Sequence, residues 1–144
     1  VRDPRAVVPS QLSSLRPALL ACGFREYPEE LRSDLVELLR FYYEHLAAVA
    51  ENNPDRMAVL YNDDLRDNLA ASVVASLESI GLAVDDGFRD KLLILSAASR
   101  RHESGHQYTI EEFGLTDDMI ASQFERVYEL YRFRQQSRQG DETL

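Results

Sequence analysis

The fold class that the sequence predicts depends on one short apolar stretch, Met57-Ala58-Val59-Leu60-Tyr61. Turn-forming residues bound it on both sides, with Asn52-Asn53-Pro54 before it and Asn62-Asp63-Asp64 after it. A continuous apolar run of this length between turns is typical of a buried parallel strand. A parallel strand needs neighbours in a sheet, and the rest of the chain has no comparable segment. We therefore expect an α/β protein whose sheet is completed by residues outside this sequence.

Upstream of this stretch, two helices are predicted. Asp3-Pro4 has the form of a helix start, and this helix should run to about Leu15 and stop before Pro17. A second, long amphipathic helix begins at Pro28 and gives the clearest pattern in the chain, because its apolar residues repeat along a single face. That face is expected to be Leu31, Leu35, Leu38, Leu39, Tyr42, Leu46 and Val49.

Downstream, three further helices are expected. The first follows Asn62-Asp63-Asp64 and is closed by Gly81 in the position that favours a left-handed residue. The second is capped by Asp85 or Asp86, and the last by Thr116. Their inward-facing side chains are predicted to be Phe88, Leu92 and Leu95 in the second, and Ile120, Phe124, Val127 and Tyr131 in the last. A polar loop joins them, and the pattern predicts one domain over residues 1–136 with a frayed tail at 137–144.

Composition excludes several functional classes. A net charge of −9 argues against general nucleic-acid binding, and no apolar run is long enough for a membrane helix. The sole cysteine, Cys22, fits a reducing, cytoplasmic compartment, and no Cys/His cluster has the spacing of a metal site. The chain begins at Val1 without a methionine, inside a motif, so we expect upstream sequence to be missing.

The opening residues, Arg2-Asp3-Pro4-Arg5-Ala6-Val7-Val8-Pro9-Ser10, form a candidate anion-binding segment. A guanidinium can bind phosphate with two hydrogen bonds, and an adjacent helix start adds backbone donors. A hydroxyl from Ser10 would add one more. The structural alternative is a capped helix whose arginines face water.

This segment resembles the 3′-phosphate-binding segment of sulfotransferases that use 3′-phosphoadenosine 5′-phosphosulfate (PAPS). In that family an arginine and a serine eight positions later hold the 3′-phosphate of the cofactor, a spacing that Arg2 and Ser10 keep. Tyr61-Asn62-Asp63-Asp64-Leu65 is similar to the family's Tyr-Glu-Asp-Leu strand end, where the tyrosine lies near the nucleotide. Asn62 departs from the usual glutamate. The structural alternative for Tyr61 is a residue that packs over the core.

The segment from Arg100 to Thr116 resembles the C-terminal end of the bacterial members, in which a basic loop closes over the cofactor. His106 and Tyr108 match a His-x-Tyr pair that precedes Phe-Gly-Leu, here Phe113-Gly114-Leu115. Arg100 and Arg101 are the basic residues expected to cover PAPS, whereas Glu103 and Gln107 stand where basic residues are frequent. The alternative is that His102 and His106 are exposed loop residues.

The resemblance extends over nearly all of residues 1–133 and implies the C-terminal part of a P-loop-type sulfotransferase domain. The complete enzyme would transfer a sulfuryl group from PAPS to a hydroxyl or amine of a small-molecule or glycan acceptor. Its cofactor-side residues would be Arg2, Ser10, Tyr61, Arg100, Arg101 and His106, with PAPS or its product adenosine 3′,5′-bisphosphate (PAP) as ligand. Catalytic residues cannot be assigned, because nothing matches the phosphosulfate-binding loop or the base. This part alone is expected to be inactive, and the sole lysine, Lys91, lies far from the expected position.

Two other functions remain open at this stage. One is a non-catalytic helical interaction domain without a nucleotide ligand, whose amphipathic helices form a bundle or a homodimer interface. The other is a different P-loop enzyme, such as a nucleotide kinase, whose arginines match by chance. Neither nucleic acid nor a membrane is expected as a partner.

Overall fold

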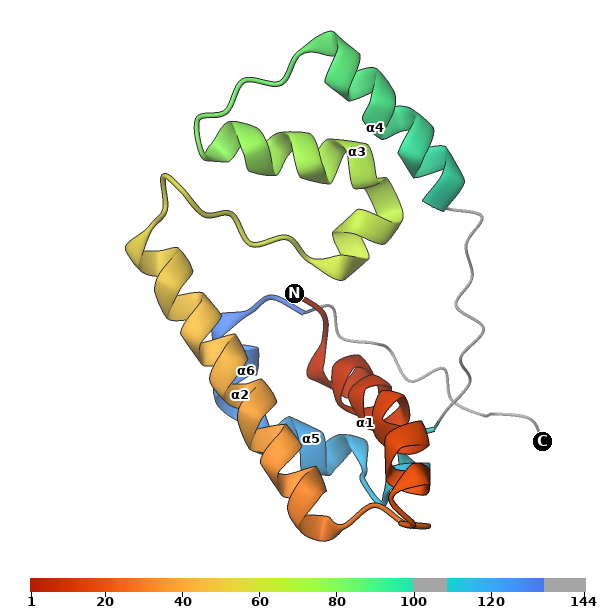
Figure 1. Cartoon of the computed structure of the whole chain (residues 1–144). Helices are drawn as coiled ribbons and strands as arrows, with labels where there is room; N and C mark the ends of the chain where they lie inside the picture. Colours follow the sequence, from red (N-terminus) through yellow and green to blue (C-terminus); the bar gives the residue numbers. More distant parts are fainter. Residues whose placement is uncertain (100–108, 134–144) are drawn as a thin grey trace, which may run out of the picture.

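The computed structural model describes residues 1–99 and 109–133, which form six α-helices and one short 3₁₀ helix (Figure 1). The elements follow in the order α1 (Pro4–Ala21), α2 (Glu29–Asn52), α3 (Asn62–Ser79), α4 (Asp86–Ser99), η1 (Glu111–Phe113), α5 (Asp117–Gln123) and α6 (Glu125–Leu130). Within this part of the chain, none of the helices combines the length and apolar character needed to cross a membrane.

The predicted fold class is wrong. The described residues contain helices and neither a strand nor a sheet, so this part of the protein is all-helical rather than α/β. Residues 57–61 connect α2 to α3, and Tyr61 has the extended backbone expected of a strand (φ −92°, ψ 135°). Among the described residues, however, the only long-range backbone pairing of this connection is with Val1. A strand assignment needs a continuous ladder of such bonds.

The helices form two groups (Figure 1). In the first group, called the bundle, α1 packs against α2 and α5, α2 packs against α6, and α5 contacts α6. In the second group, called the hairpin, α3 and α4 pack against each other. Most of the buried apolar side chains lie in the bundle, and of those in the hairpin only Ala70 and Leu92 are buried among the described residues.

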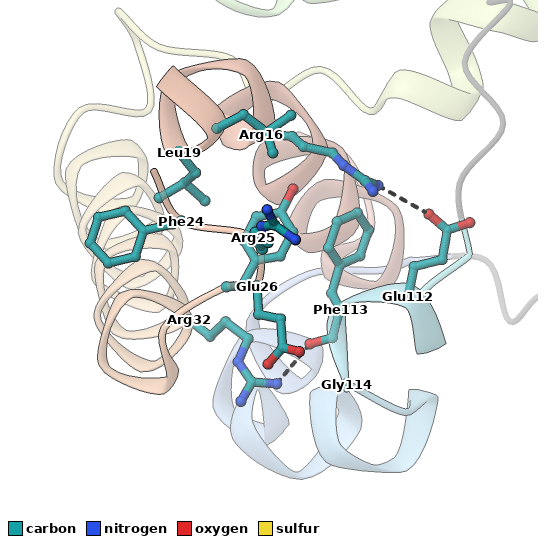
Figure 2. A pocket seen from close by; sticks show the side chains of 11 residues that line it. Arg16, Leu19, Phe24, Arg25, Glu26, Arg32, Glu112, Phe113 and Gly114 are labelled. Carbon is teal, nitrogen blue, oxygen red and sulfur yellow. Dashed lines mark hydrogen bonds and ion pairs between the residues drawn. The ribbon is translucent and has the colours of Figure 1, made fainter. Parts of the chain in front are cut away.

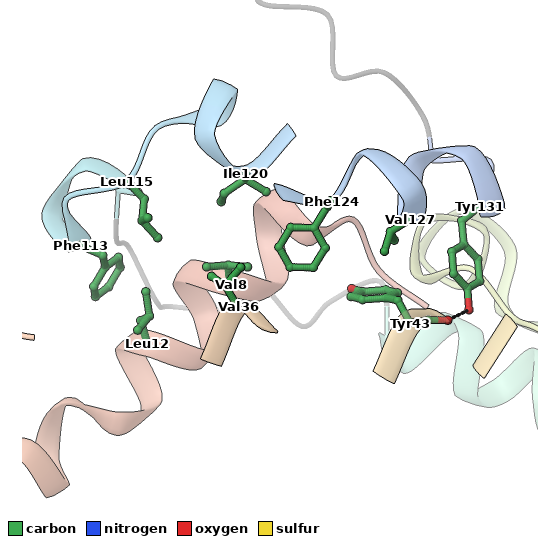
Figure 3. Packing of buried hydrophobic residues seen from close by; sticks show 10 residues of the cluster. All are labelled: Val8, Leu12, Val36, Tyr43, Phe113, Leu115, Ile120, Phe124, Val127 and Tyr131. Atoms are coloured by element: carbon green, nitrogen blue, oxygen red, sulfur yellow. Dashed lines mark hydrogen bonds between the residues drawn. The ribbon is translucent and has the colours of Figure 1, made fainter. Parts of the chain in front are cut away.

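The core of the molecule lies in the bundle, where side chains from the two ends of the chain meet (Figure 3). Val8 and Leu12 of α1 and Ile120, Phe124 and Val127 of the C-terminal helices have no exposed surface. Thr116 caps α5 by accepting a hydrogen bond from the Met119 backbone N–H at 3.2 Å. The predicted cap and apolar face are confirmed, but the single helix predicted here is two short helices, α5 and α6, divided at Phe124.

The start of α1 is confirmed, but its predicted end is wrong. The helix continues through Pro17 and ends at Ala21, and Gly23, whose φ is +86°, follows its cap residue Cys22. Gly23 N–H donates to Leu20 O and Phe24 N–H donates to Leu19 O, which is the hydrogen-bond pattern of a Schellman cap. Pro17 is exposed, where water can satisfy the carbonyl that the missing N–H leaves free. The glycine, rather than the proline, therefore ends the helix.

The apolar face predicted for α2 is partly wrong. Val36 and Tyr43 are buried, and Leu35, Leu39 and Ala47 pack against the same core. The side chains of Leu38 and Tyr42 are 47% and 57% exposed instead. The helix carries apolar residues on more than one face, so its periodicity does not reveal which face packs.

The hairpin matches its predicted limits better than its predicted packing. Gly81 has φ +77° and follows the end of α3, and the Asp85 carboxylate accepts the Phe88 N–H at 2.8 Å before α4. Leu92 is buried as expected, whereas Phe88 and Leu95 are 40% and 56% exposed. Those two predictions are wrong because, among the described helices, α3 is the one against which α4 mainly packs.

Candidate functional site

The candidate site is the segment that leads into α1. Val1, the first residue of this segment, pairs with the connection between α2 and α3. The Val1 carbonyl accepts a hydrogen bond from the Asn62 N–H at 2.7 Å, and the Val1 amino group donates to Leu60 O. These bonds flank Tyr61 on both sides. They bring the two segments that carry Arg2 and Tyr61 together, although about 60 residues separate them in the sequence.

Asp3 fixes the first turn of α1 from inside the protein. It is 8% exposed, and its Oδ1 accepts the Arg5 N–H at 2.8 Å, which caps the helix. The same oxygen accepts the Tyr128 hydroxyl at 2.8 Å, so α6 holds the cap in place. Burial, together with the hydrogen bond to Asp3, raises the pKa of Tyr128. The Arg5 guanidinium lies 5.3 Å from the centre of the Tyr128 ring, which gives Arg5 a structural partner.

Arg2 is held by its backbone and leaves its side chain in solvent. The Tyr43 hydroxyl of α2 donates a hydrogen bond to the Arg2 carbonyl. Burial, followed by the negative charge of Asp3, raises the pKa of Tyr43, so this hydroxyl stays protonated and remains a donor. Arg2 is exposed, unlike the two residues that follow it. Its guanidinium is therefore free to reach a ligand from an anchored backbone.

Ser10 lies on α1, seven residues after the cap, and is half-buried. Seven residues advance a helix by two turns and roughly 10 Å, so Ser10 faces the same side as the Asp3 position. An anion bound by both residues would have to lie between the Ser10 hydroxyl and the end of the Arg2 side chain. Arg2 itself precedes the helix, so its sharing of one ligand with Ser10 stays a prediction.

Tyr61 takes part in an aromatic cluster beside this segment. Its ring makes edge-on contacts with Tyr131 and Phe133, with centroid distances of 6.5 and 6.1 Å. Its hydroxyl accepts the Arg132 N–H at 3.3 Å. Tyr61 therefore has the core-packing role that was the structural alternative, and the residue is half-buried.

The structure pairs the backbone segments that carry Arg2 and Tyr61, and it places Ser10 on α1. Arg100, Arg101 and His106, the remaining predicted cofactor residues, lie outside the described residues, as does His102. Sequence reasoning missed Tyr43 and Tyr128, which anchor the segment from α2 and α6. Their roles depend on contacts across 41 and 125 positions of the chain, so no local pattern could have revealed them.

Chemically, this arrangement can hold an anion but offers little for proton transfer. One exposed guanidinium and one hydroxyl are available, and the nearby Asp3 carboxylate is engaged by two donors. Within residues 1–99 and 109–133, no group of three His, Cys, Asp or Glu side chains could hold a metal ion. No protein-family model, curated protein or solved structure matches this chain.

Proposed function

We propose that this chain forms the nucleotide-binding side of a PAPS-dependent sulfotransferase. The observation that carries the proposal is the backbone pairing of Val1 with Leu60 and Asn62. The family resemblance assigns Arg2 and Tyr61 to one cofactor, and that pairing joins the two segments. If Arg2 and Tyr61 bind one cofactor, their segments must lie close together, and nothing in the local sequence requires that.

In the proposed complex, Arg2 and Ser10 hold the 3′-phosphate and Tyr61 borders the nucleotide. Arg100, Arg101 and His106 cover the cofactor. The anchors at Asp3 and at the Arg2 carbonyl keep the backbone fixed while the Arg2 side chain reorganises around the phosphate, which lowers the entropic cost of binding.

The reaction is in-line transfer of the sulfuryl group to an acceptor hydroxyl or amine. The 3′-phosphate is remote from the sulfur, so these residues bind and orient the cofactor and take no part in proton transfer. The catalytic base and the phosphosulfate cradle are assigned to no residue of this chain, and we place the enzyme in the cytoplasm. The acceptor is a small molecule or a glycan.

The direct test compares two nucleotides that differ by one phosphate. Titration calorimetry of the chain should give tighter binding for PAP than for adenosine 5′-monophosphate. Arg2→Ala should cost about 1.5–3 kcal/mol of PAP affinity, the scale of a hydrogen bond to a charged group. The same change should leave the weaker affinity for the monophosphate unaltered.

Arg56→Ala is the matched control, because Arg56 is also an exposed arginine but lies in the turn after α2. It should change neither affinity. Equal binding of the two nucleotides, or the same loss from Arg2→Ala and Arg56→Ala, would contradict the proposal.

A non-catalytic interaction domain is the second candidate, and the exposed apolar side chains favour it. Phe41 on α2 is 56% exposed, and Leu93 and Ile94 on α4 are 60% and 70% exposed. This function predicts concentration-dependent association by sedimentation and no thermal shift with PAP. A PAP-dependent shift in a monomeric sample would decide against it.

A further inference from the structure

A cavity lies at the end of α1 far from the Arg2 segment (Figure 2). It has a volume of about 380 Å³ and is formed by the end of α1, the connection to α2, the start of α2 and η1. That volume is within the range of small-molecule sites. Because α1 has 18 residues, its two ends are roughly 27 Å apart. The cavity is therefore separate from the Arg2 segment.

One wall of the cavity is held in place by several contacts. Arg32 Nη1 donates a hydrogen bond to the Phe113 carbonyl at 2.8 Å. A Cβ atom on Gly114 would lie 2.5 Å from the same nitrogen, so the left-handed glycine (φ +67°) lets the guanidinium approach. Tyr27 packs edge-on against Phe113 at 5.1 Å, and its hydroxyl donates to Leu12 O at 3.0 Å. The wall is thus formed before any ligand arrives.

The charged side chains around the cavity favour an anion. Three guanidinium groups line it, those of Arg16, Arg25 and Arg32, against the two carboxylates of Glu26 and Glu112. The lining therefore carries a net charge of +1 in a chain of net charge −9. Glu112 forms an ion pair with Arg16 at 3.9 Å. Arg25 has no hydrogen-bond or ion-pair partner among the described residues, and Arg32 keeps donors beyond the one that Phe113 uses.

The remaining lining is apolar and partly exposed. Leu19, Leu20 and Phe24 border the opening, with Leu20 56% and Phe24 49% exposed. A ligand that covered these side chains would remove apolar surface from water, which favours binding at about 25 cal/mol per Å². The cavity therefore combines unpaired positive charge with an apolar border.

We infer that this cavity binds a small organic anion, an aromatic carboxylate, with its carboxylate at Arg25 and Arg32 and its ring against Phe24. This inference is independent of the proposed nucleotide site, because no residue is shared between them. The rigid Arg32 wall orients the carboxylate, and the apolar border selects an aromatic body over a simple inorganic anion.

The experiment uses 2-naphthoate with the whole chain, followed by two-dimensional NMR. Shift changes are expected for residues 16–32 and 112–114 and not for the exposed apolar side chains of α4. Neutral 2-naphthamide, which lacks the negative charge, and acetate, which lacks the aromatic ring, should each bind several-fold more weakly than 2-naphthoate. Arg25→Gln should weaken naphthoate binding by about threefold to fivefold, the scale of one exposed charge pair.

Phe24→Ala should weaken naphthoate binding as well, and Arg56→Gln should leave it unchanged. Arg2→Ala and saturating PAP should have no effect, which separates this site from the nucleotide proposal. Equal affinity for the carboxylate and the amide, or an unchanged affinity in Arg25→Gln, would overturn the inference. Shifts spread over the apolar surfaces of α2 and α4 would overturn it too.

Discussion

The bundle and the hairpin use similar helices but differ in how they bury them. In the bundle, six aliphatic or aromatic side chains are completely buried: Pro4, Val8, Leu12, Ile120, Phe124 and Val127. In the hairpin, the buried set reduces to Ala70, Leu92 and Ser96, and large apolar side chains of α4 face solvent. Helices this short depend on packing for most of their stability. The bundle is therefore stabilised by its own packing, whereas the packing within the hairpin stabilises the hairpin only in part.

The two regions also differ in the sequence distance over which they are joined. The bond between Tyr128 and Asp3 closes the bundle across 125 positions, whereas the bond between Ser96 and Ala70 closes the hairpin across 26. Long-range closure makes the bundle depend on both ends of the chain. We expect the hairpin to form and open more readily, because it needs only local contacts.

The largest expected effect comes from the core of the bundle. Phe124→Ala removes a fully buried ring that contacts Tyr43 edge-on at 6.1 Å, so it should lower the free energy of unfolding by about 3–5 kcal/mol. Ile94→Ala is the control in the hairpin, where the side chain is 70% exposed, and should stay within about 0.5 kcal/mol. Urea unfolding followed by circular dichroism measures both. Similar losses would show that the two regions do not differ.

Sequence reasoning succeeded where a few adjacent residues control the backbone. The caps at Asp3 and Thr116 were predicted, and Asp85 was one of two candidates, because a side chain there bonds an N–H two or three residues later. The glycine after α3 was predicted for the same local reason. Gly23 is a local signal of the same kind at the end of α1, whereas Pro17 lies inside the helix.

Reasoning from sequence failed where distant segments decide. The apolar connection at residues 57–61 has a strand-like composition, yet a strand exists only through its neighbours, and Val1 alone pairs with it among the described residues. Leu38 and Leu95 are apolar at helical spacing, but a partner helix has to be present on that side to bury them. For the candidate site, Arg2 and Tyr61 could be proposed from the sequence, whereas the anchoring roles of Tyr43 and Tyr128 could not.

The second prediction concerns the polar link of the bundle. Tyr128→Phe keeps the ring beneath Arg5 and removes the hydroxyl that bonds Asp3, so it should cost about 1.5–3 kcal/mol, as for a bond to a carboxylate. Thermal unfolding at neutral pH measures the loss. A negligible change would mean that water replaces the hydroxyl and that the chain ends are not held by this bond.

The same variant has a predicted pH dependence. Burial raises the pKa of Tyr128 in the folded state above the usual value near 10, so the folded protein keeps a proton that the unfolded chain loses. The contribution of Tyr128 to the free energy of unfolding is therefore fully present below about pH 10 and declines as the pH rises further. Tyr43, whose pKa is raised chiefly by burial, adds to the decline. Tyr128→Phe should make the loss of stability above pH 10 less steep without abolishing it.

The smallest effect is expected at the polar link of the hairpin. The Ser96 hydroxyl accepts the Ala70 N–H at 3.1 Å, just after Asn68 interrupts the helical backbone of α3 (φ −151°, ψ 78°). Ser96→Ala leaves that buried N–H without its acceptor and should cost about 1 kcal/mol. Ser79→Ala, at an exposed serine of the same hairpin, should cost less than about 0.5 kcal/mol. Hydrogen exchange should then quicken in α3 and α4 while α1 and α2 keep their protection, because Ser96 makes its bond inside the hairpin. Equal acceleration in the bundle would mean that both groups unfold as one unit.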